Sequence, residues 1–345
     1  MHNKHTFSSI VPAASARHNW GMTTYPTSTV STGAPLHTIL GAGGVIGREL
    51  SQQLSCLSKR IREVSRHPGP LHSNAELVAA DLTDAKATSL AVAGSDVVYL
   101  VAGLAYNTAT WQKQWPLVMR NVIGACRQHG ARLVFLDNVY AYGHVEGVMT
   151  EATPFNPCSR KGEVRAAVAT TLLDAMRCGE VQALIARSAD FYGPGAALSF
   201  LEAVLFARLR AGKSPQWLGD PAAVHTFTFT PDIGQALAVL GQCPAAFGQT
   251  WHLPTARQLD GNEVTGSALT AAACAIAAQP TRLQVPPPWL VHTMGWVIPV
   301  IRENNEMFYQ LNHAYRFDGS KTEKALGWQA TPYAAGLRQT MRPAN

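Results

Sequence analysis

Charged residues are scarce in this chain. Asp, Glu, Lys and Arg together make up 14% of the 345 residues, whereas apolar residues make up 47%. That balance excludes a disordered or fibrous protein and favours a globular one with a large core. The net charge of +6 comes from scattered basic residues, and no dense Lys/Arg run is interleaved with aromatics. We therefore expect no nucleic-acid partner.

Clustered cysteines and long apolar runs are also missing. The six cysteines form no C-x-x-C pair and no Cys/His cluster at metal-ligand spacing, so we expect no metal site and a reducing, cytoplasmic location. The most apolar late segment, Trp289 to Ile301, is broken by His292 and Pro299 and falls short of the roughly 20 residues that a bilayer span needs. The sequence predicts a buried helix there and no membrane partner.

Residues 1–34 contain no acidic residue and no continuous apolar stretch. The second absence excludes a secretory signal peptide. A Ser-rich, acid-poor segment is compatible with an organelle transit peptide, with a flexible tail, or with a start upstream of a true initiator at Met22. We favour the last two and expect the fold to begin near Pro35.

From Pro35 onward, short apolar runs alternate with helical stretches, a pattern typical of repeated βαβ units. We expect strands at Leu36 to Leu40, Ile61 to Ser65, Glu76 to Ala80, Val97 to Val101, Leu133 to Leu136 and Ala183 to Arg187. We expect helices at Val45 to Lys59, Trp115 to His129 and Val164 to Cys178. Because right-handed crossovers join such elements, the sequence predicts an α/β fold with a Rossmann-type doubly wound parallel sheet.

The regular alternation of strand-like and helix-like segments ends after Gly193. A helical run (Ser199 to Ala211) and a β-like run (Val224 to Thr230) then precede a Pro-rich tail. We expect residues 35–195 to form a dinucleotide-binding Rossmann domain that also receives parts of 224–255. Residues 196–345 should form mainly a smaller, mostly helical substrate-binding lid, and residues 1–34 a flexible tail.

A glycine-rich turn connects the first expected strand to the first helix, in the segment LHTILGAGGVIGREL. Gly41 allows a tight turn off the strand, Gly44 lets the backbone approach a pyrophosphate, and Gly47 lets the helix pack closely on the sheet. The helix N-terminus then presents free N–H groups to the anion. The sequence therefore predicts a site for NADP(H) or NAD(H).

The second strand lacks the acidic residue that NAD-preferring sites usually place at its end. It ends instead at Ser65 and Arg66. Arg66, with Arg48 just after the last glycine, offers a guanidinium group to a 2′-phosphate, so we favour NADP(H) over NAD(H). Asp81 follows the third strand, where it would either meet the adenine or cap a helix, and both roles stay open.

These features resemble the extended short-chain dehydrogenase/reductases, the NAD-dependent epimerase/dehydratase family. The likeness spans nearly the whole chain after the tail. It is carried by the glycine turn, Asp81-Leu82, Ala102-Gly103, Asn121 to Gly124, Tyr142-Gly143, Arg187 with Phe191 to Gly195, Phe229 to Asp232 and Lys321 to Trp328. The expected cofactor-binding residues are Gly41, Gly44, Val45, Ile46, Gly47, Arg66, Asp81, Leu82, Ala102, Gly103, Asn121 and Arg187.

The resemblance implies a serine or threonine, a tyrosine and a lysine for proton transfer, and this sequence departs from all three. In the register that keeps Pro157, Ser159 and Gly162 aligned, Asn138, Lys161 and Arg165 take these places. An alternative register puts Cys158 and Gly162 there and leaves no acid or base. A lysine replaces the tyrosine only if its pKa falls through burial or a nearby cation such as Arg165. The other reading of Lys161 is an anion ligand.

Four further residues near the expected strand ends, Tyr142, His144, Phe191 and Tyr192, are candidates for substrate binding, although Tyr142 also suits packing and His144 a solvated loop. We expect an NAD(P)-dependent oxidoreductase or epimerase acting on a small carbonyl, hydroxyl or nucleotide-sugar-like substrate. The alternative is a non-catalytic NADP(H)-binding regulator or scaffold. A homodimer stays open.

Overall fold

A seven-stranded parallel sheet forms the centre of the protein. The computed structural model describes residues 33–72, 74–287, 289–290, 293 and 299–342, all within one compact unit, Ser31–Asn345. Nearly all of the expected tail therefore lies outside the described residues. The sheet consists of β1 (Leu36–Leu40), β2 (Arg60–Ser65), β3 (Glu76–Ala79), β4 (Val97–Leu100), β5 (Arg132–Asp137), β7 (Ala183–Arg187) and β10 (Thr250–His252).

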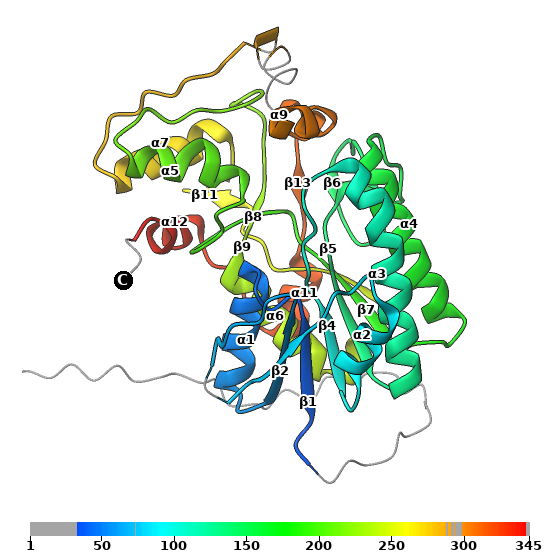
Figure 1. Ribbon diagram of the computed structural model, residues 1–345. Coiled ribbons are helices and arrows are strands. Elements are labelled where there is room, and N and C mark those ends of the chain that lie inside the picture. The colour runs from blue at the N-terminus through cyan, green and yellow to red at the C-terminus, as the bar shows by residue number, and fades with distance from the viewer. Residues whose placement is uncertain (1–32, 73, 288, 291–292, 294–298, 343–345) are drawn as a thin grey trace, which may run out of the picture. The chain divides into compact units, whose positions relative to one another are not determined.

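The strand order is β10-β7-β5-β4-β1-β2-β3, and every neighbouring pair is parallel (Figure 1). The first three strands run outward in one direction from β1, and the later strands run in the other direction from β4. In doubly wound sheets, a reversal of this kind places the ligand-binding crevice at the carboxyl ends of the two central strands, here β1 and β4. The predicted Rossmann-type doubly wound sheet is confirmed.

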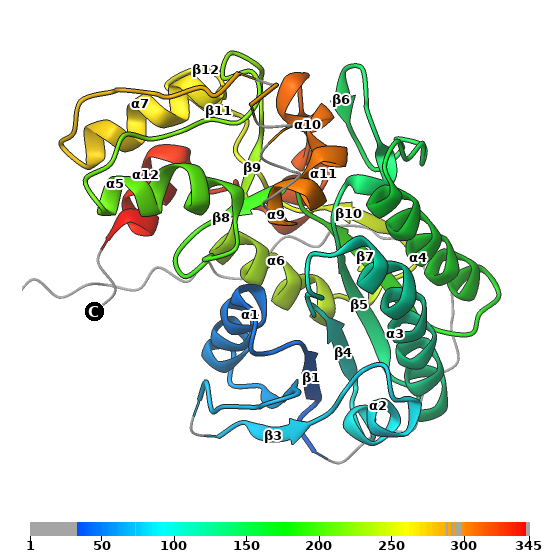
Figure 2. The same cartoon turned by 45° about the horizontal axis from the view of Figure 1, so that its top comes forward.

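Helices cover both faces of the sheet (Figure 2). On one face, α3 (Thr108–His129) packs between α2 (Ala85–Val92) and α4 (Arg160–Arg177). On the other face, α1 (Val45–Cys56) packs against α6 (Thr230–Gln242). Successive strand residues point to opposite faces, so a central strand such as β1 contributes to two cores. Leu40 belongs to the core under α3, and Ile39 belongs to the core under α1.

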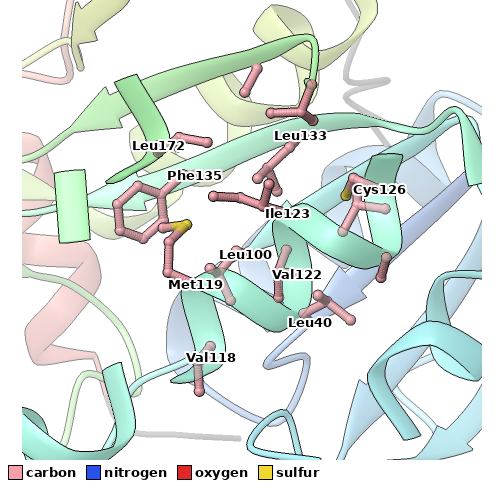
Figure 3. Close-up of a cluster of buried hydrophobic side chains, with 14 of the residues drawn as sticks. Leu40, Leu100, Val118, Met119, Val122, Ile123, Cys126, Leu133, Phe135 and Leu172 are labelled. Carbon is pink, nitrogen blue, oxygen red and sulfur yellow. The ribbon is translucent and has the colours of Figure 1, made fainter. Parts of the chain in front are cut away.

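The core under α3 is built from large apolar side chains of the helix and of the sheet (Figure 3). Met119, Val122 and Ile123 of α3 project toward Leu100 of β4 and Phe135 of β5 in this cluster. All five side chains are buried. Their spacing on α3 is the three-to-four residue period of an amphipathic helix, which explains why this segment folds as one.

Two helices begin earlier than the sequence predicts. α3 begins at Thr108 rather than Trp115, because the Asn107 side chain caps it by accepting from the Thr110 amide. Pro116 lies within this helix and misleads a sequence reading, since proline usually marks a helix start. α4 begins at Arg160 rather than Val164, behind its N-cap Ser159. Both early starts bring helix N-termini to the carboxyl edge of the sheet.

The later part of the chain has a core of its own, which includes Leu205, Trp217, Phe227 and Leu269. Its helices are η2 (Glu202–Phe206), α5 (Ala207–Arg210), α7 (Gly266–Ile276), α9 (Pro299–Asn304), η4 (Asn305–Met307), α10 (Tyr309–Asn312), α11 (Ser320–Leu326) and α12 (Tyr333–Met341). Short strand pairs join β8 (Asp190–Tyr192) to β9 (Phe227–Phe229), β6 (Val148–Met149) to β13 (Arg316–Phe317), and β11 (Gln258–Leu259) to β12 (Asn262–Glu263). The turns η1 (Tyr140–Tyr142) and η3 (Pro244–Ala246) complete the elements.

Trp289 and Leu290 are helical as predicted, but the predicted burial of the Trp289 to Ile301 helix is wrong for these two residues. Trp289 is 67% exposed and Leu290 is 36% exposed. Most of the remaining segment lies outside the described residues. Among the helices that the structure describes, none combines the length and the apolar character needed to span a bilayer.

Candidate active site

Two glycines of the turn after β1 are required by the fold itself. Gly41 has a φ of 103°, and a Cβ there would lie 2.4 Å from the Cα of Ala102. A Cβ at Gly47 would lie 2.5 Å from the carbonyl oxygen of Gly41. Only glycine accommodates the first backbone conformation and the second close approach. The turn therefore brings α1 against β1 and β4 at the crevice.

Gly43 and Gly44 are exposed and are not required by any such packing. A Cβ at Gly43 would meet nothing closer than 3.9 Å, and one at Gly44 nothing closer than 3.4 Å. No side chain caps α1, whose N-cap is Gly44. The amides of its first turn thus have no side-chain partner, and the helix dipole favours an anion beside them. This arrangement fits the pyrophosphate of a dinucleotide.

Arg66 and Asp81 both lie at the exposed carboxyl edge beside β2 and β3. Asp81 accepts hydrogen bonds from the amide and the hydroxyl of Thr83 at 2.9 and 2.8 Å. These bonds, with the charge of Arg66, lower the pKa of Asp81. The helix-cap alternative for Asp81 is wrong, because Asp84 caps α2 by accepting from the Ala87 amide.

The loops after β3 and β4 complete the expected dinucleotide site. Asn121 of α3 donates from Nδ2 to the Leu82 carbonyl at 2.9 Å and so fixes the loop after β3. Ala102 packs against the turn at Gly41, and Gly103 is exposed with open space around its missing side chain. The edge beside the turn is therefore lined by small residues and by backbone.

Asn138 directly follows β5, as expected for a group that orients a substrate oxygen. Its Oδ1 accepts from the Tyr140 amide at 3.1 Å, which fixes the plane of the side-chain amide. Among the described residues, no partner accepts from its Nδ2. The Nδ2 group of Asn138 is therefore available to donate a hydrogen bond to a substrate carbonyl oxygen at this edge of the sheet.

Arg165 and Arg187 share one carboxylate below the surface. Asp137, at the end of β5, accepts from Nε of Arg165 at 2.8 Å and from Nε of Arg187 at 3.1 Å. The Arg165 guanidinium also lies 4.4 Å from the Trp115 ring centroid. All three charged side chains are almost completely buried. Arg187 has a further bond to the Tyr142 hydroxyl at 2.8 Å, so both arginines are held within the protein.

Lys161 is completely buried, and its ammonium group faces four oxygens. Nζ donates to the Thr108 hydroxyl at 2.8 Å, to the carbonyl and carboxylate of Glu303 at 2.7 and 2.8 Å, and to the Glu306 carboxylate at 3.0 Å. It also lies 4.8 Å from the centroid of the Tyr106 ring. An ammonium group has three N–H donors. In this arrangement Lys161 therefore has none left for a substrate.

The same two carboxylates cap two helices. Glu303 accepts from the Thr108 amide at 2.8 Å, at the start of α3. Glu306 accepts from the Arg160 amide at 2.8 Å, at the start of α4. Burial by itself would raise the pKa of Glu303, but the hydrogen bonds from Lys161 and Thr108 lower it to about 2. The turn formed by α9 and η4 thus carries two carboxylates to two positive helix ends.

The alternative register would place Cys158 and Gly162 at the catalytic positions. Cys158 is exposed. Gly162 lies in the first turn of α4, where a Cβ would come within 2.6 Å of the Tyr140 carbonyl oxygen. Gly162 therefore permits α4 to pack closely against η1. The residue before it, Lys161, contacts Tyr106 and Glu303.

The four expected substrate residues do not lie together. Tyr142 and Tyr192 are buried, the first bonded to Arg187 and the second stacked on Tyr333. Phe191 packs on the core under α1. His144 is exposed, and its ring lies 4.4 Å from that of His313.

Sequence reasoning missed several site residues: Tyr106, Asp190, His225, Glu303 and Glu306. Asp190 comes just after the end of β7, and its Oδ2 lies 3.2 Å from Nε2 of His225. The charge of Asp190 adds to burial in raising the pKa of Tyr106 and Tyr140. A carboxylate after β7 is visible in the sequence, but the glutamates lie too far along the chain for any local pattern to place them here.

Among the described residues, no group of three or more His, Cys, Asp or Glu side chains is arranged to hold a metal.

Comparisons with known proteins agree with this architecture. The family model described as the NAD dependent epimerase/dehydratase family matches residues 37–251. The dTDP-glucose 4,6-dehydratase of Mycobacterium tuberculosis H37Rv is 29% identical over 171 residues, which cover 47% of this chain and 52% of that protein. That of Mycolicibacterium smegmatis is 26% identical over 178 residues, covering 49% and 54%. The chain spans about half the length of the curated relatives it matches.

Solved structures share the fold across most of the chain. A dTDP-glucose 4,6-dehydratase from Streptomyces venezuelae with NAD and TYD bound gives a TM-score of 0.72 at 18% identity, covering 89% of this chain and 96% of that one. A UDP-glucose 4-epimerase from Thermus thermophilus in complex with NAD gives 0.70 at 18% identity, covering 89% and 97%. At this identity the likeness concerns the fold alone. From the family-model match, this chain belongs to the NAD-dependent epimerase/dehydratase family.

Proposed function

We propose that this protein binds NADP(H) or NAD(H) at the glycine turn and catalyses oxidation, reduction or epimerisation at a carbonyl or hydroxyl carbon of a nucleotide-sugar-like or other small substrate. The observation that carries this proposal is the uncapped N-terminus of α1 behind Gly44, at the crevice between β1 and β4. The amides, the helix dipole and the exposed glycines there suit a phosphate-bearing ligand such as the pyrophosphate of a dinucleotide. Membership of the family supports the same cofactor class.

NADP(H) is the form that we favour. Arg66 directly follows β2 with an exposed guanidinium that can pair with a 2′-phosphate, and β2 itself does not end in an acidic residue that would bind the free ribose hydroxyls. The similar structures named above hold NAD, so the choice needs a direct test. Calorimetric titration should give tighter binding of NADPH than of NADH, and Arg66→Ala should abolish the difference. Tighter binding of NADH by the unaltered protein would overturn the preference.

The dinucleotide, when bound, supplies the chemistry of hydride transfer at its nicotinamide. Asn138 then orients the substrate oxygen through its Nδ2 group, which is fixed by the bond to the Tyr140 amide. The predicted proton transfer by Lys161 requires Glu303 and Glu306 to withdraw, because they occupy its donors. Asp137 accepts from two nitrogens of Arg165, so the remaining N–H donors of its guanidinium are the ones that would serve a nicotinamide ribose.

The test of the proposed function is turnover. Purified protein with each dinucleotide is incubated with panels of nucleotide sugars and of small carbonyls and alcohols, and products are followed by nicotinamide absorbance and by mass spectrometry. Mass spectrometry is needed because an epimerase returns its cofactor to the starting redox state. A substrate-dependent product is the expected result, and none across the panels would sink the proposal.

The second candidate function is a cofactor-binding regulator or scaffold without catalysis. It is favoured by the pairing of both basic residues at the catalytic positions with carboxylates: Glu303 and Glu306 occupy Lys161, and Asp137 pairs with Arg165. Such a protein would bind NADP(H) and give no product with any substrate. A difference in its partner binding between NADPH and NADP⁺ would support this candidate.

A further inference from the structure

We infer that Asp190 and His225 form the proton-transfer pair of this site, with Asp190 as the member that meets the substrate oxygen. The inference rests on the proposed function. It starts from the hydrogen bonds of His225, a buried residue just before β9. Its Nδ1 lies 3.1 Å from the Gln310 carbonyl oxygen, and its Nε2 lies 3.2 Å from Asp190 Oδ2.

Both ring nitrogens of His225 thus face oxygens. A carbonyl oxygen only accepts, so Nδ1 carries a hydrogen. A neutral imidazole then has a bare lone pair at Nε2, and that lone pair would face the lone pairs of an ionised Asp190. The contact is a hydrogen bond only if one further proton sits between Nε2 and Oδ2. The pair therefore holds a proton, either as imidazolium with carboxylate or as imidazole with carboxylic acid.

The surroundings suit such a stored proton. His225 lies between the rings of Tyr315 and Phe227, with centroids 4.3 and 4.4 Å away. Stacked aromatic faces stabilise a positive ring by cation–π attraction. The His225 side chain is 2% exposed and the Asp190 side chain 24% exposed, so Asp190 is the member of the pair that a substrate can reach.

Asp190 lies among phenols that come from three parts of the chain. Its charge adds to burial in raising the pKa of Tyr106, after β4, of Tyr140, after β5, and of Tyr309 and Tyr315, in the C-terminal segment. With their pKa values raised in this way, these phenols stay protonated at neutral pH. Tyr106 also lies under the Lys161 ammonium, so the pair stands beside the expected catalytic positions.

The step that the pair performs balances as follows for a carbonyl substrate. The reduced dinucleotide, when bound, would supply the hydride, and with it both electrons, to the carbonyl carbon. The carbonyl π bond would break, and its oxygen would take the shared proton from the Asp190 carboxyl, which would have to turn that proton from Nε2 toward the substrate. The product is the alcohol, and the pair is left as carboxylate and neutral imidazole facing each other. Because the lone pairs of Oδ2 and Nε2 then repel each other, the pair takes up a proton again. The proton comes from solvent or, in the reverse reaction, from the alcohol.

The stored proton is tested without any substrate by NMR of ¹⁵N-histidine and ¹³C-aspartate labelled protein at pH 7. Signals of the pair are assigned by their loss in His225→Gln and Asp190→Asn. The expected result is a proton on both nitrogens of His225, or on Nδ1 with a protonated Asp190 carboxyl. A neutral His225 whose bare Nε2 faces an ionised Asp190 would overturn the inference, as would an Nε2–H tautomer with a bare Nδ1.

The transfer step is tested by turnover of a substrate found in the panel above. Asp190→Asn should lower kcat by about 100-fold or more, the usual contribution of a general acid, and leave dinucleotide binding unchanged. Asp174→Asn, which alters an exposed carboxylate of α4, is the matched control and should keep full kcat. Full activity of Asp190→Asn, with loss in Lys161→Met, would reject the pair and leave the proposed function standing. If no substrate turns over in the unaltered protein, the proposed function and the transfer step fall together, while the NMR result still decides where the proton lies.

Discussion

The Lys161 ammonium and the Glu303 carboxylate lie 2.8 Å apart, although 142 residues separate them in the sequence. This contact joins the first turn of α4 to α9 at the carboxyl edge of the sheet. Because Lys161 is completely buried, its charge depends on protein oxygens in place of water. The turn formed by α9 and η4 is therefore part of the candidate active site, and its two glutamates determine whether Lys161 is accessible.

Replacing Glu303 with Gln should lower the free energy of unfolding by about 1–3 kcal/mol, because the buried ammonium loses one of its two carboxylates. Glu263→Gln is the matched control. Glu263 pairs with Arg316 at an exposed position, so its loss should cost less than about 1 kcal/mol. Denaturant titrations of the two variants measure the difference. Equal, small losses would show that the Glu303 contact does little in solution.

Asp137→Asn should destabilise the protein by about 3–5 kcal/mol. The change leaves Arg165 and Arg187 buried beside an uncharged amide, and an unpaired buried charge is costly. Asp174→Asn breaks an exposed pair with Arg177 and serves as control, with an expected change near zero. Thermal unfolding of the two variants checks this, and a melting temperature for Asp137→Asn equal to that of the control would contradict the buried network.

Gly44→Ala and Gly47→Ala should separate binding from folding. Gly44 has room for a methyl group within the protein, so Gly44→Ala should keep its stability while weakening dinucleotide binding about tenfold or more. Gly47→Ala forces a Cβ against the Gly41 carbonyl and should cost about 1–3 kcal/mol of stability. Gly124→Ala, within α3 and free of close contacts, is the control for both measurements. Unweakened binding in Gly44→Ala would argue against a pyrophosphate at this turn.

The stability of the protein should fall as the pH is lowered from 7 to 5. Burial, then the charge of Arg187, lowers the pKa of His252 to about 3, and burial, then Lys59, lowers that of His37 to about 4. Both stay neutral in the folded protein at pH 5, whereas in the unfolded chain they bind protons below about 6.5. Each histidine therefore costs about 2 kcal/mol over this interval.

His252→Gln isolates one of these contributions. Glutamine can accept from the Tyr142 hydroxyl and donate to the Asp318 carbonyl as His252 does, but it does not titrate. Urea titrations at pH 7 and 5 should show a loss smaller by about 2 kcal/mol in the variant than in the unaltered protein. The same loss in both proteins would mean that His252 is not held neutral in the folded state.

Local patterns in the sequence located the sheet because its strands are short, apolar and bounded by turn residues. Leu36–Leu40 and Ala183–Arg187 have the predicted bounds, and the other four predicted strands differ by one residue at one or both ends. The seventh strand of the sheet, Thr250–His252, was not predicted as a strand. The start of α3 was misplaced because Pro116 lies inside the helix, where the cap at Asn107 is the true signal. Asn107 is a residue type that favours caps, so this start could have been found.

The electrostatic partners of the site could not be found in this way. The family resemblance aligned Lys161 and Arg165 with catalytic positions, but the carboxylates that occupy them come from β5 and from α9 and η4. A bond between residues so distant in sequence leaves no periodic pattern. The pairing of Asp190 with His225 depends likewise on β8 and β9 lying side by side, which only the tertiary structure supplies.

Calorimetric titration of NADPH and NADH into the purified full-length protein tests the central claim most directly. The account predicts saturable binding of at least one dinucleotide, NADPH more tightly, and weaker binding by Gly44→Ala at unchanged stability. No heat of binding from either dinucleotide to a folded protein would contradict it.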